Sequence, residues 1–319
     1  MPGRSSLLLI KPGSFGDVVH ALPCAAALKR HDPALHLTWL VDERWQSLLQ
    51  ENPFIDELVV FPRQRFRGLA GKLKSVPWAL DLRRLTPDVV LDLQGLLRSA
   101  LMAKCTGAPT TIGLSDAREG ARYFYDKVTP VRPAEHSVRR YLRSLAFLGI
   151  PEVTNVEFPL PEGSIPSAAP REPFVLLHPF ARGRGKSLTP EQVVAFCQAL
   201  HPRTVVIAGA GAEVPSLPSN AVSLLNTTSI AELIGLIRAA DFVVSVDSGP
   251  MHIAAAITPK LVSIHTWSDP RLVGPFNEQA WIWQGGGLRP QKLDVVELPP
   301  AREPSLADIQ TIADFVRSA

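Results

Sequence analysis

Cysteine is scarce in this 319-residue sequence, and no long apolar run interrupts it. Its three cysteines (Cys24, Cys105 and Cys197) are odd in number and lack paired spacing, which disfavours a disulfide framework or a zinc site and favours a reducing compartment. No apolar stretch approaches the roughly 20 residues of a membrane-spanning helix. The run Leu7–Ile10 is too short for a signal peptide, so we expect a cytoplasmic protein.

Several signatures of known chemistry are also missing. A Walker phosphate loop, a complete three-glycine dinucleotide fingerprint and a Gly-x-Ser-x-Gly elbow do not occur. Cys24 and Cys197 fall in helical runs that look buried, so nucleophilic hydrolase chemistry is disfavoured. His178, His252 and His265 follow or flank strands without paired ligand spacing, so we expect no metal site.

What is present is a repeated strand–helix rhythm in a chain long enough for two domains. The hydrophobic fraction of 46% and the charged fraction of 20% suit a protein with a sizeable core. The expected strands are 7–11, 35–41, 57–61, 88–93, 174–178, 204–208, 241–246 and 261–265. The expected helices are 17–30, 43–50, 68–84, 96–105, 137–148, 190–200, 230–240, 251–256 and 306–317.

This alternation predicts an α/β protein with two Rossmann-like, doubly wound parallel sheets that face a central cleft. Residues 161–173 are rich in proline, serine and alanine and are expected to form a linker. The N-terminal domain would then cover residues 1–160, and the C-terminal domain residues 174–319 with its terminal helix.

Charge is distributed unevenly along the chain. Residues 1–160 hold 21 Lys and Arg and 16 Asp and Glu, a net charge of +5. Residues 161–319 hold the other 12 Lys and Arg and 14 Asp and Glu, a net charge of −2. Seven basic residues and one acidic residue lie within 63–84. They form either a solvated helix face or a surface for phosphates, carboxylates or anionic lipid heads. Nucleic acid is less favoured because no recognisable binding motif accompanies them.

The most informative run is 241–256, where an apolar strand ends in Asp247-Ser248-Gly249 and opens into an alanine-rich helix. Ligands of parallel sheets bind at the carboxyl ends of strands, and a helix N-terminus attracts anions. Gly249 permits close approach of a ligand, and Pro250 suits the first helical turn. The alternative is an ordinary capped turn, with Asp247 or Ser248 as the N-cap.

Three further loops follow predicted strands. In the first, Asp17 begins a helix and suits a general base that deprotonates an acceptor hydroxyl, unless it is only a helix cap. In the second, Lys186 ends a basic, glycine-punctuated loop that suits a departing phosphate, unless the loop is merely solvated. In the third, Glu213 follows Gly209 and Gly211 and is placed to accept ribose hydroxyls.

The motifs at 16–23, 92–96 and 247–252, in this order, resemble those of glycosyltransferase family 9, and the similarity runs from about residue 6 to residue 280. The resemblance implies a GT-B fold with an N-terminal acceptor domain and a C-terminal nucleotide-sugar domain. It implies inverting transfer of L-glycero-D-manno-heptose from ADP-heptose to Kdo of the lipopolysaccharide inner core, carried on lipid A. Peripheral contact with the inner membrane would follow from such an acceptor.

The resemblance also implies residue roles. Asp17 matches the catalytic base, and Lys186 matches a lysine on the donor phosphates. The donor-binding residues would be Glu213, Asp247, Ser248, Gly249, Pro250, Met251 and His252. The acceptor-binding residues would be Ser14, Arg63, Arg65, Arg67 and Lys72. If Lys186 and a helix N-terminus take the diphosphate charge, no metal cofactor is required.

Two segments depart from the family pattern, both on the donor side. Residues 181–185 read Ala-Arg-Gly-Arg-Gly where relatives carry hydroxyl residues, and 265–270 read His-Thr-Trp-Ser-Asp-Pro where relatives show Gly-Pro-Thr. Alternatives therefore stay open: a family 9 transferase with another donor or acceptor, another nucleotide-sugar enzyme such as an epimerase, or a non-catalytic nucleotide-sugar-binding protein.

Overall fold

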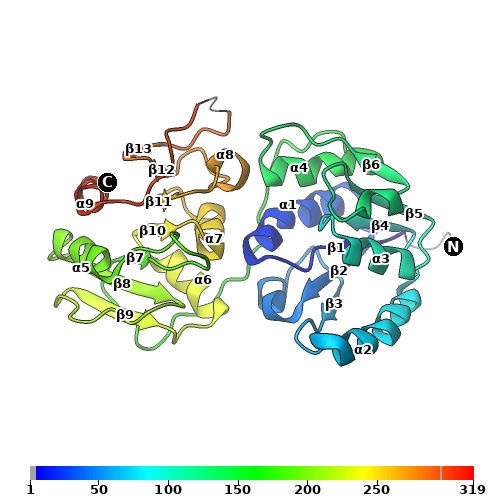
Figure 1. Cartoon of the computed structure of the whole chain (residues 1–319), viewed down its shortest axis with the longest axis horizontal. Coiled ribbons are helices and arrows are strands. Elements are labelled where there is room, and N and C mark those ends of the chain that lie inside the picture. Colours follow the sequence, from blue (N-terminus) through cyan, green and yellow to red (C-terminus); the bar gives the residue numbers. More distant parts are fainter. Residues whose placement is uncertain (1–4, 295–296) are drawn as a thin grey trace. The chain divides into compact units, whose positions relative to one another are not determined.

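The computed structural model describes residues 5–294 and 297–319, without the side chains of Leu69, Ala70 and Lys72. The chain divides between Pro161 and Glu162 into two compact units, which we call unit 1 (1–161) and unit 2 (162–319). Figure 1 shows that each unit is a sheet flanked by helices. The division falls at the start of the predicted linker, whose Ser164 N–H donates to the carbonyl of Ala231 at 3.0 Å within unit 2.

Unit 1 contains a six-stranded sheet with the order β3-β2-β1-β4-β5-β6, in which every paired strand is parallel. This is the strand order of a doubly wound dinucleotide-binding fold. The strands are β1 Ser6–Ile10, β2 His36–Asp42, β3 Glu57–Phe61, β4 Val89–Asp92, β5 Thr110–Leu114 and β6 Lys127–Thr129. The helices are α1 Phe15–His31, α2 Gly68–Asp81, α3 Leu97–Cys105 and α4 Ser137–Arg143, with 3-10 turns η1 Glu43–Leu48, η2 Leu82–Leu85, η3 Ala121–Phe124 and η4 Ser144–Leu148.

Unit 2 contains a seven-stranded sheet with the order β13-β12-β11-β10-β7-β8-β9, and only the β12–β13 pair is antiparallel among its described pairings. The strands are β7 Phe174–His178, β8 Thr204–Gly209, β9 Ala221–Leu225, β10 Phe242–Val246, β11 Leu261–Ile264, β12 Trp281–Gln284 and β13 Gly287–Pro290. The helices are α5 Pro190–Ala199, α6 Ile230–Ala239, α7 Gly249–Ile257, α8 Pro270–Val273 and α9 Leu306–Ser318.

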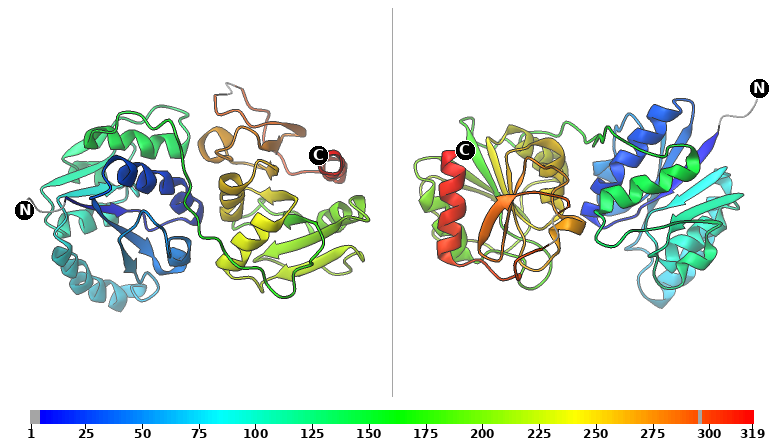
Figure 2. Two further views of the ribbon diagram at one scale, coloured as in Figure 1. Left: turned by 180° about the vertical axis from the view of Figure 1, so that it is seen from behind. Right: turned by 90° about the horizontal axis from the view of Figure 1, so that it is seen from above.

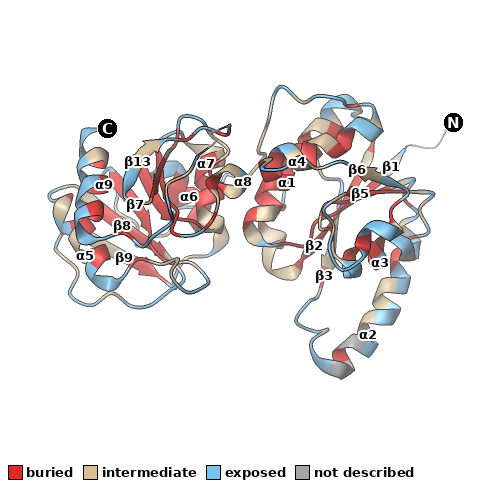
Figure 3. Cartoon of the chain, turned by 45° about the horizontal axis from the view of Figure 1, so that its top comes forward, coloured by how far each residue is buried: buried red, intermediate tan, exposed pale blue. Residues whose placement is uncertain are grey.

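Burial explains why the central strands of both sheets are mostly apolar instead of alternating between apolar and polar residues. Helices cover both faces of each sheet (Figure 2), and the buried residues concentrate on the strands and the inward helix faces (Figure 3). A parallel strand covered on both sides has no solvent face, so apolar residues dominate it. All five residues of β7 and of β10 are buried, including His178 and Ser245.

Helix α9 closes one side of the core of unit 2. Ile309, Ile312 and Val316 join the cluster built by β7, β8 and α5. Phe315 packs on Trp281 with ring centroids 4.5 Å apart. The helix begins with a capping box, in which Ser305 is the N-cap, so its start is fixed by local hydrogen bonds as well as by packing.

Every expected strand exists within a residue or two of its predicted bounds, and so does every expected helix start. The segment expected as a helix at 43–50 is the 3-10 turn η1. Strands β5, β6, β9, β12 and β13 were not anticipated. In the described part of the chain, no helix combines the length and the apolar character that crossing a bilayer requires.

Candidate active-site residues

The first candidate group lies where β1 ends and α1 begins. Ser14 is the N-cap of α1, and Asp17 is the third residue of the helix, so the expectation that Asp17 itself is the N-cap is wrong. Asp17 Oδ2 accepts hydrogen bonds from the backbone N–H and the hydroxyl of Ser14, each at 2.9 Å. Ser14 therefore fixes one carboxylate oxygen, while the Asp17 side chain remains 33% exposed.

The other oxygen of Asp17 faces two buried side chains. The Tyr141 hydroxyl donates to Asp17 Oδ1 at 3.3 Å, and Lys11 Nζ lies 4.0 Å from the same oxygen. Burial, helped by the neighbouring Asp17 charge, raises the pKa of Tyr141 well above its ordinary value, so the phenol stays protonated. Burial lowers the pKa of Lys11, and Asp17 opposes that change. Lys11 is only 3% exposed, so Asp17 is its main compensating charge.

The turn after β4 supports this arrangement from the neighbouring strand. Lys11 Nζ donates to the carbonyl of Leu93 at 2.9 Å, and the N–H of Gly13 donates to Gln94 Oε1 at 3.3 Å. Asp92 is fully buried and accepts from the N–H of Gln94 and the Tyr125 hydroxyl at 2.9 and 2.8 Å. Burial raises the pKa of Asp92 despite these bonds. The turn is thus a rigid support for the loop that carries Asp17.

The basic segment of unit 1 lies mostly on the surface. Arg63, Arg65 and Arg67 are exposed, and Arg67 is the N-cap of α2. Arg63 Nη1 lies 3.9 Å from Asp42 Oδ2. Lys72 was predicted with these residues, but its side chain lies outside the described part of the structure.

The second candidate group lies in unit 2, at the carboxyl ends of β7, β10 and β11. Lys186 Nζ donates to Asp247 Oδ2 at 3.2 Å and stands 4.2 Å from the centroid of the Trp267 ring. Asp247 is buried and Lys186 is partly buried, whereas Trp267 is 62% exposed. The glycine-punctuated loop before Lys186 closes on itself, because the N–H of Ala181 donates to Ser187 Oγ at 3.0 Å.

Asp247 keeps its negative charge although it is buried. Burial by itself would raise the pKa of this carboxyl, but its interactions with His265, His252 and Lys186 together outweigh burial, so the net shift is downward. Burial lowers the pKa of His265 to about 4, so this ring is neutral near pH 7. His265 is held between the hydroxyls of Ser268 and Ser263, at 2.9 and 3.1 Å.

The strand tip beside Asp247 forms the start of α7. Ser248 is the N-cap of α7, and its hydroxyl lies 3.2 Å from His178 Nδ1, at the end of β7. Gly249 and Pro250 open the helix, and Met251 and His252 follow as buried residues. Helix α7 follows β10, and the loop that carries Lys186 follows the neighbouring strand β7. The first N–H groups of α7 and the cation of Lys186 therefore lie at the same edge of one sheet.

The loop after β8 approaches the same strand end. The Asn226 side chain clamps Gly211 by accepting from its N–H and donating to its carbonyl, both at 3.0 Å. A Cβ on Gly209 would lie 2.3 Å from His178 Nε2, and one on Gly211 would lie 2.2 Å from Phe180. Glycine is thus required for this close packing, and Glu213 follows it as an exposed residue.

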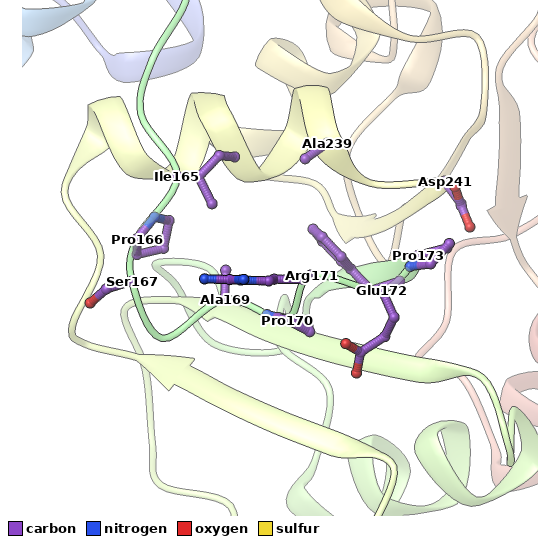
Figure 4. A pocket seen from close by; sticks show the side chains of 11 residues that line it. Ile165, Pro166, Ser167, Ala169, Pro170, Arg171, Glu172, Pro173, Ala239 and Asp241 are labelled. Carbon is purple, nitrogen blue, oxygen red and sulfur yellow. The ribbon is translucent and has the colours of Figure 1, made fainter.

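A separate cavity of about 610 Å³ lies at the other end of the sheet of unit 2 (Figure 4). It is lined by residues 165–167, 169–174, 239 and 241, which precede or open β7 and β10. The loops that carry Lys186 and Asp247 follow these strands. The cavity is therefore remote from the predicted chemistry of the unit.

Sequence reasoning missed the groups that surround Asp17. Tyr141 lies in an ordinary amphipathic helix, about 120 residues further along, and carries no local signal. Lys11 directly follows the four apolar residues 7–10, a position that could have indicated a buried charge in need of a partner. Arg98 was also missed: its guanidinium carbon lies 5.4 Å from the centroid of the Phe61 ring, and burial together with the charge of Arg63 lowers its pKa.

Comparisons with known proteins agree with the fold and with the motifs. Residues 79–293 match the model of glycosyltransferase family 9 (heptosyltransferase). Lipopolysaccharide heptosyltransferase 1 of Pseudomonas aeruginosa is 27% identical over 298 residues, with 85% of this chain and 81% of that protein covered. The Escherichia coli K12 protein of the same name is 24% identical over 310 residues, covering 86% and 92%.

Solved structures show the same fold at lower identity. E. coli heptosyltransferase WaaC with ADP superposes with a TM-score of 0.77 at 19% identity, over 98% of this chain and 99% of that one. E. coli ADP-heptose LPS heptosyltransferase II gives 0.76 at 20% identity, over 98% of both chains. These findings confirm the predicted GT-B fold, and since the family model spans more than half of the sequence, the chain belongs to glycosyltransferase family 9 and is a glycosyltransferase.

Proposed function

We propose that this enzyme transfers a heptose with inversion from ADP-L-glycero-D-manno-heptose to Kdo of the lipopolysaccharide inner core. Family membership and the curated relatives, which are lipopolysaccharide heptosyltransferases, support the reaction class. The observation that carries the mechanism is the setting of Asp17. Its carboxylate is one-third exposed, is oriented by Ser14 and is accompanied by the cation of Lys11.

In this proposal Asp17 is the general base. An inverting transfer needs one group to take the proton from the acceptor hydroxyl while the hydroxyl oxygen attacks the anomeric carbon. The bond from that carbon to the diphosphate breaks at the same time, on the opposite side of the sugar. Ser14 and Tyr141 orient the carboxylate, so its Oδ1 is presented in a defined direction before the acceptor binds.

Unit 2 supplies the donor side of the reaction. Lys186 is already held beside Asp247 and neutralises the negative charge that develops on the departing ADP. The start of α7, from Ser248 to His252, adds backbone N–H groups for a phosphate. Asp247 would accept sugar hydroxyls, and Glu213 would accept those of the ribose.

Unit 1 holds the acceptor in this proposal, through Ser14 and through Arg63, Arg65, Arg67 and Lys72. Kdo carries a carboxylate and lipid A carries phosphates, and guanidinium groups suit both. Because lipid A is embedded in a bilayer, we place the enzyme at the cytoplasmic face of the inner membrane, in peripheral contact with it.

A second candidate is a family 9 transferase with another donor sugar or acceptor. The position of Trp267 favours it, because this exposed ring occupies the space next to the Lys186 cation. An aromatic ring at that place narrows which sugars or nucleotides can reach the lysine.

Release of ADP from ADP-heptose, measured with and without Kdo–lipid A, tests the proposal. Release that depends on the acceptor supports both the donor and the acceptor assignment. If ADP is released from ADP-heptose only with a different acceptor, the donor assignment stands and the acceptor assignment is wrong. If no acceptor gives release but ADP still binds, the transfer reaction proposed here is wrong for this donor.

A further inference from the structure

The described aromatic and apolar contacts of helix α2 with unit 1 lie on one side of the helix. Trp78 packs on Phe61 and on Phe66, with ring centroids 5.2 and 5.7 Å apart. Leu82, directly after the helix, is buried in the same cluster. Figure 1 shows α2 at the periphery of unit 1, and no helix or strand in the described part of that unit covers its opposite side.

The outer side of α2 is apolar. Leu73, Val76 and Leu80 are 71%, 55% and 50% exposed. Their i, i+3, i+7 spacing places them on one face, opposite to Trp78. A helix on the surface of a globular protein normally has polar residues on this face, so we call these three residues the α2 stripe.

Cations surround the α2 stripe. Arg65, Arg67, Lys74, Arg83 and Arg84 are all exposed, before, within and after the helix. Asp81 is the one acidic residue among 63–84, and it pairs with Arg84 at 3.4 Å. An apolar face between cationic residues is the pattern of a helix that lies in the interface of an anionic bilayer.

We propose that α2 docks on the anionic lipid bilayer itself, with Leu73, Val76 and Leu80 inserted among the acyl chains and the cations at the headgroups. The lipid-linked acceptor of the proposed function explains why such docking is useful, but the docking needs no acceptor. A second copy of the chain fits the stripe less well. In a two-fold symmetric contact, the cations that surround the stripe in one copy would face the same cations in the other copy and repel them.

The experiment measures flotation of the full-length protein with vesicles that contain phosphatidylglycerol and phosphatidylethanolamine but no lipopolysaccharide. The test variant is the double change Leu73→Ser and Leu80→Ser. The matched control is Ile165→Ser with Leu306→Ser, since these side chains are 55% and 54% exposed and belong to unit 2. A third variant, Lys74→Gln, tests the charge.

We expect the wild type and the matched control to float with the anionic vesicles. Loss of the two leucines is expected to lower the partition coefficient about ten-fold or more. Loss of the Lys74 charge is expected to lower it about five-fold, and vesicles of phosphatidylcholine alone should bind weakly. ADP binding by the leucine variant should equal that of the wild type, because α2 is in the other unit from Lys186 and Asp247.

Equal flotation of the leucine variant and the wild type would overturn the proposal. A concentration-dependent dimer in sedimentation equilibrium that the leucine variant abolishes would also overturn it, in favour of self-association. Because no acceptor is present in the vesicles, neither result bears on whether the enzyme transfers heptose.

Discussion

Replacing Asp17 with asparagine tests two roles of this carboxylate: the general base of the proposed function and the partner of the buried Lys11 cation. If Asp17 is the general base that we propose, its loss should lower the transfer rate about 10²- to 10⁴-fold. It also compensates the charge of Lys11, whose Nζ lies 4.0 Å away and which is almost fully buried. Two charges at this separation interact by about 4 kcal/mol at an effective dielectric constant of about 20. Since Asp17 is one-third exposed, we expect Asp17→Asn to cost about 1 to 3 kcal/mol of stability.

A double variant distinguishes the two roles. Adding Lys11→Met removes the buried charge and leaves the Leu93 carbonyl without its donor, at a cost of about 1 kcal/mol. We expect the double variant to recover most of the stability that Asp17→Asn loses, but none of the transfer rate. Urea unfolding measures the first quantity, and ADP release at saturating donor measures the second.

Recovery of transfer in the double variant would refute the reasoning. Asp17 would then serve only to neutralise Lys11, and the base would be another group. Unchanged stability in Asp17→Asn would refute the electrostatic part alone, because it would mean that solvent screens the pair almost completely.

Three further predictions concern unit 2. Lys186→Met should weaken ADP binding about ten-fold, and equal calorimetric affinities would contradict its phosphate contact. Burial lowers the pKa of His265 from an ordinary 6.5 to about 4, so between these pH values the ring is protonated in the unfolded chain but neutral in the folded chain. Stability should therefore fall as the pH falls from about 6.5 to 4, by at most about 3 kcal/mol, and denaturation of His265→Gln should show a flatter pH profile. Gly211→Ala should lower nucleotide affinity because its Cβ would collide with Phe180, whereas Gly287→Ala, with its nearest contact at 3.9 Å, should bind like the wild type.

The sequence was sufficient to predict the architecture because its main signals are local. Continuous apolar runs such as 7–10 and 242–246 mark strands that are buried on both faces, and capping residues such as Ser229 and Ser305 mark helix starts. Two of the strands that were missed, β6 and β13, lack such a signal. β6 has three residues, and β13 is a short antiparallel edge rich in glycine, arginine and proline.

The candidate site was predictable only in part. The sequence singled out Lys186 and Asp247 separately, each as a residue that follows a predicted strand. Their contact at 3.2 Å follows from the topology, because those two strands are neighbours in the sheet. Tyr141 reaches Asp17 through the packing of α4 on α1, and helix packing partners are not encoded at any fixed spacing. Trp267 was noticed as a departure from the family, but its stacking on Lys186 depends on the course of a loop.

The position of α9 has a consequence for the order in which the protein folds during synthesis. Unit 1 draws its whole core from residues that precede 162, so it can fold while the rest of the chain is being translated. Unit 2 cannot, because Ile309, Ile312 and Val316 complete the cluster that β7 and α5 begin more than 100 residues earlier. Until α9 leaves the ribosome, the apolar side of that cluster has no intramolecular cover. We therefore expect the nascent second unit to expose apolar surface for longer than the first, and so to be the part of the chain more prone to aggregate during synthesis.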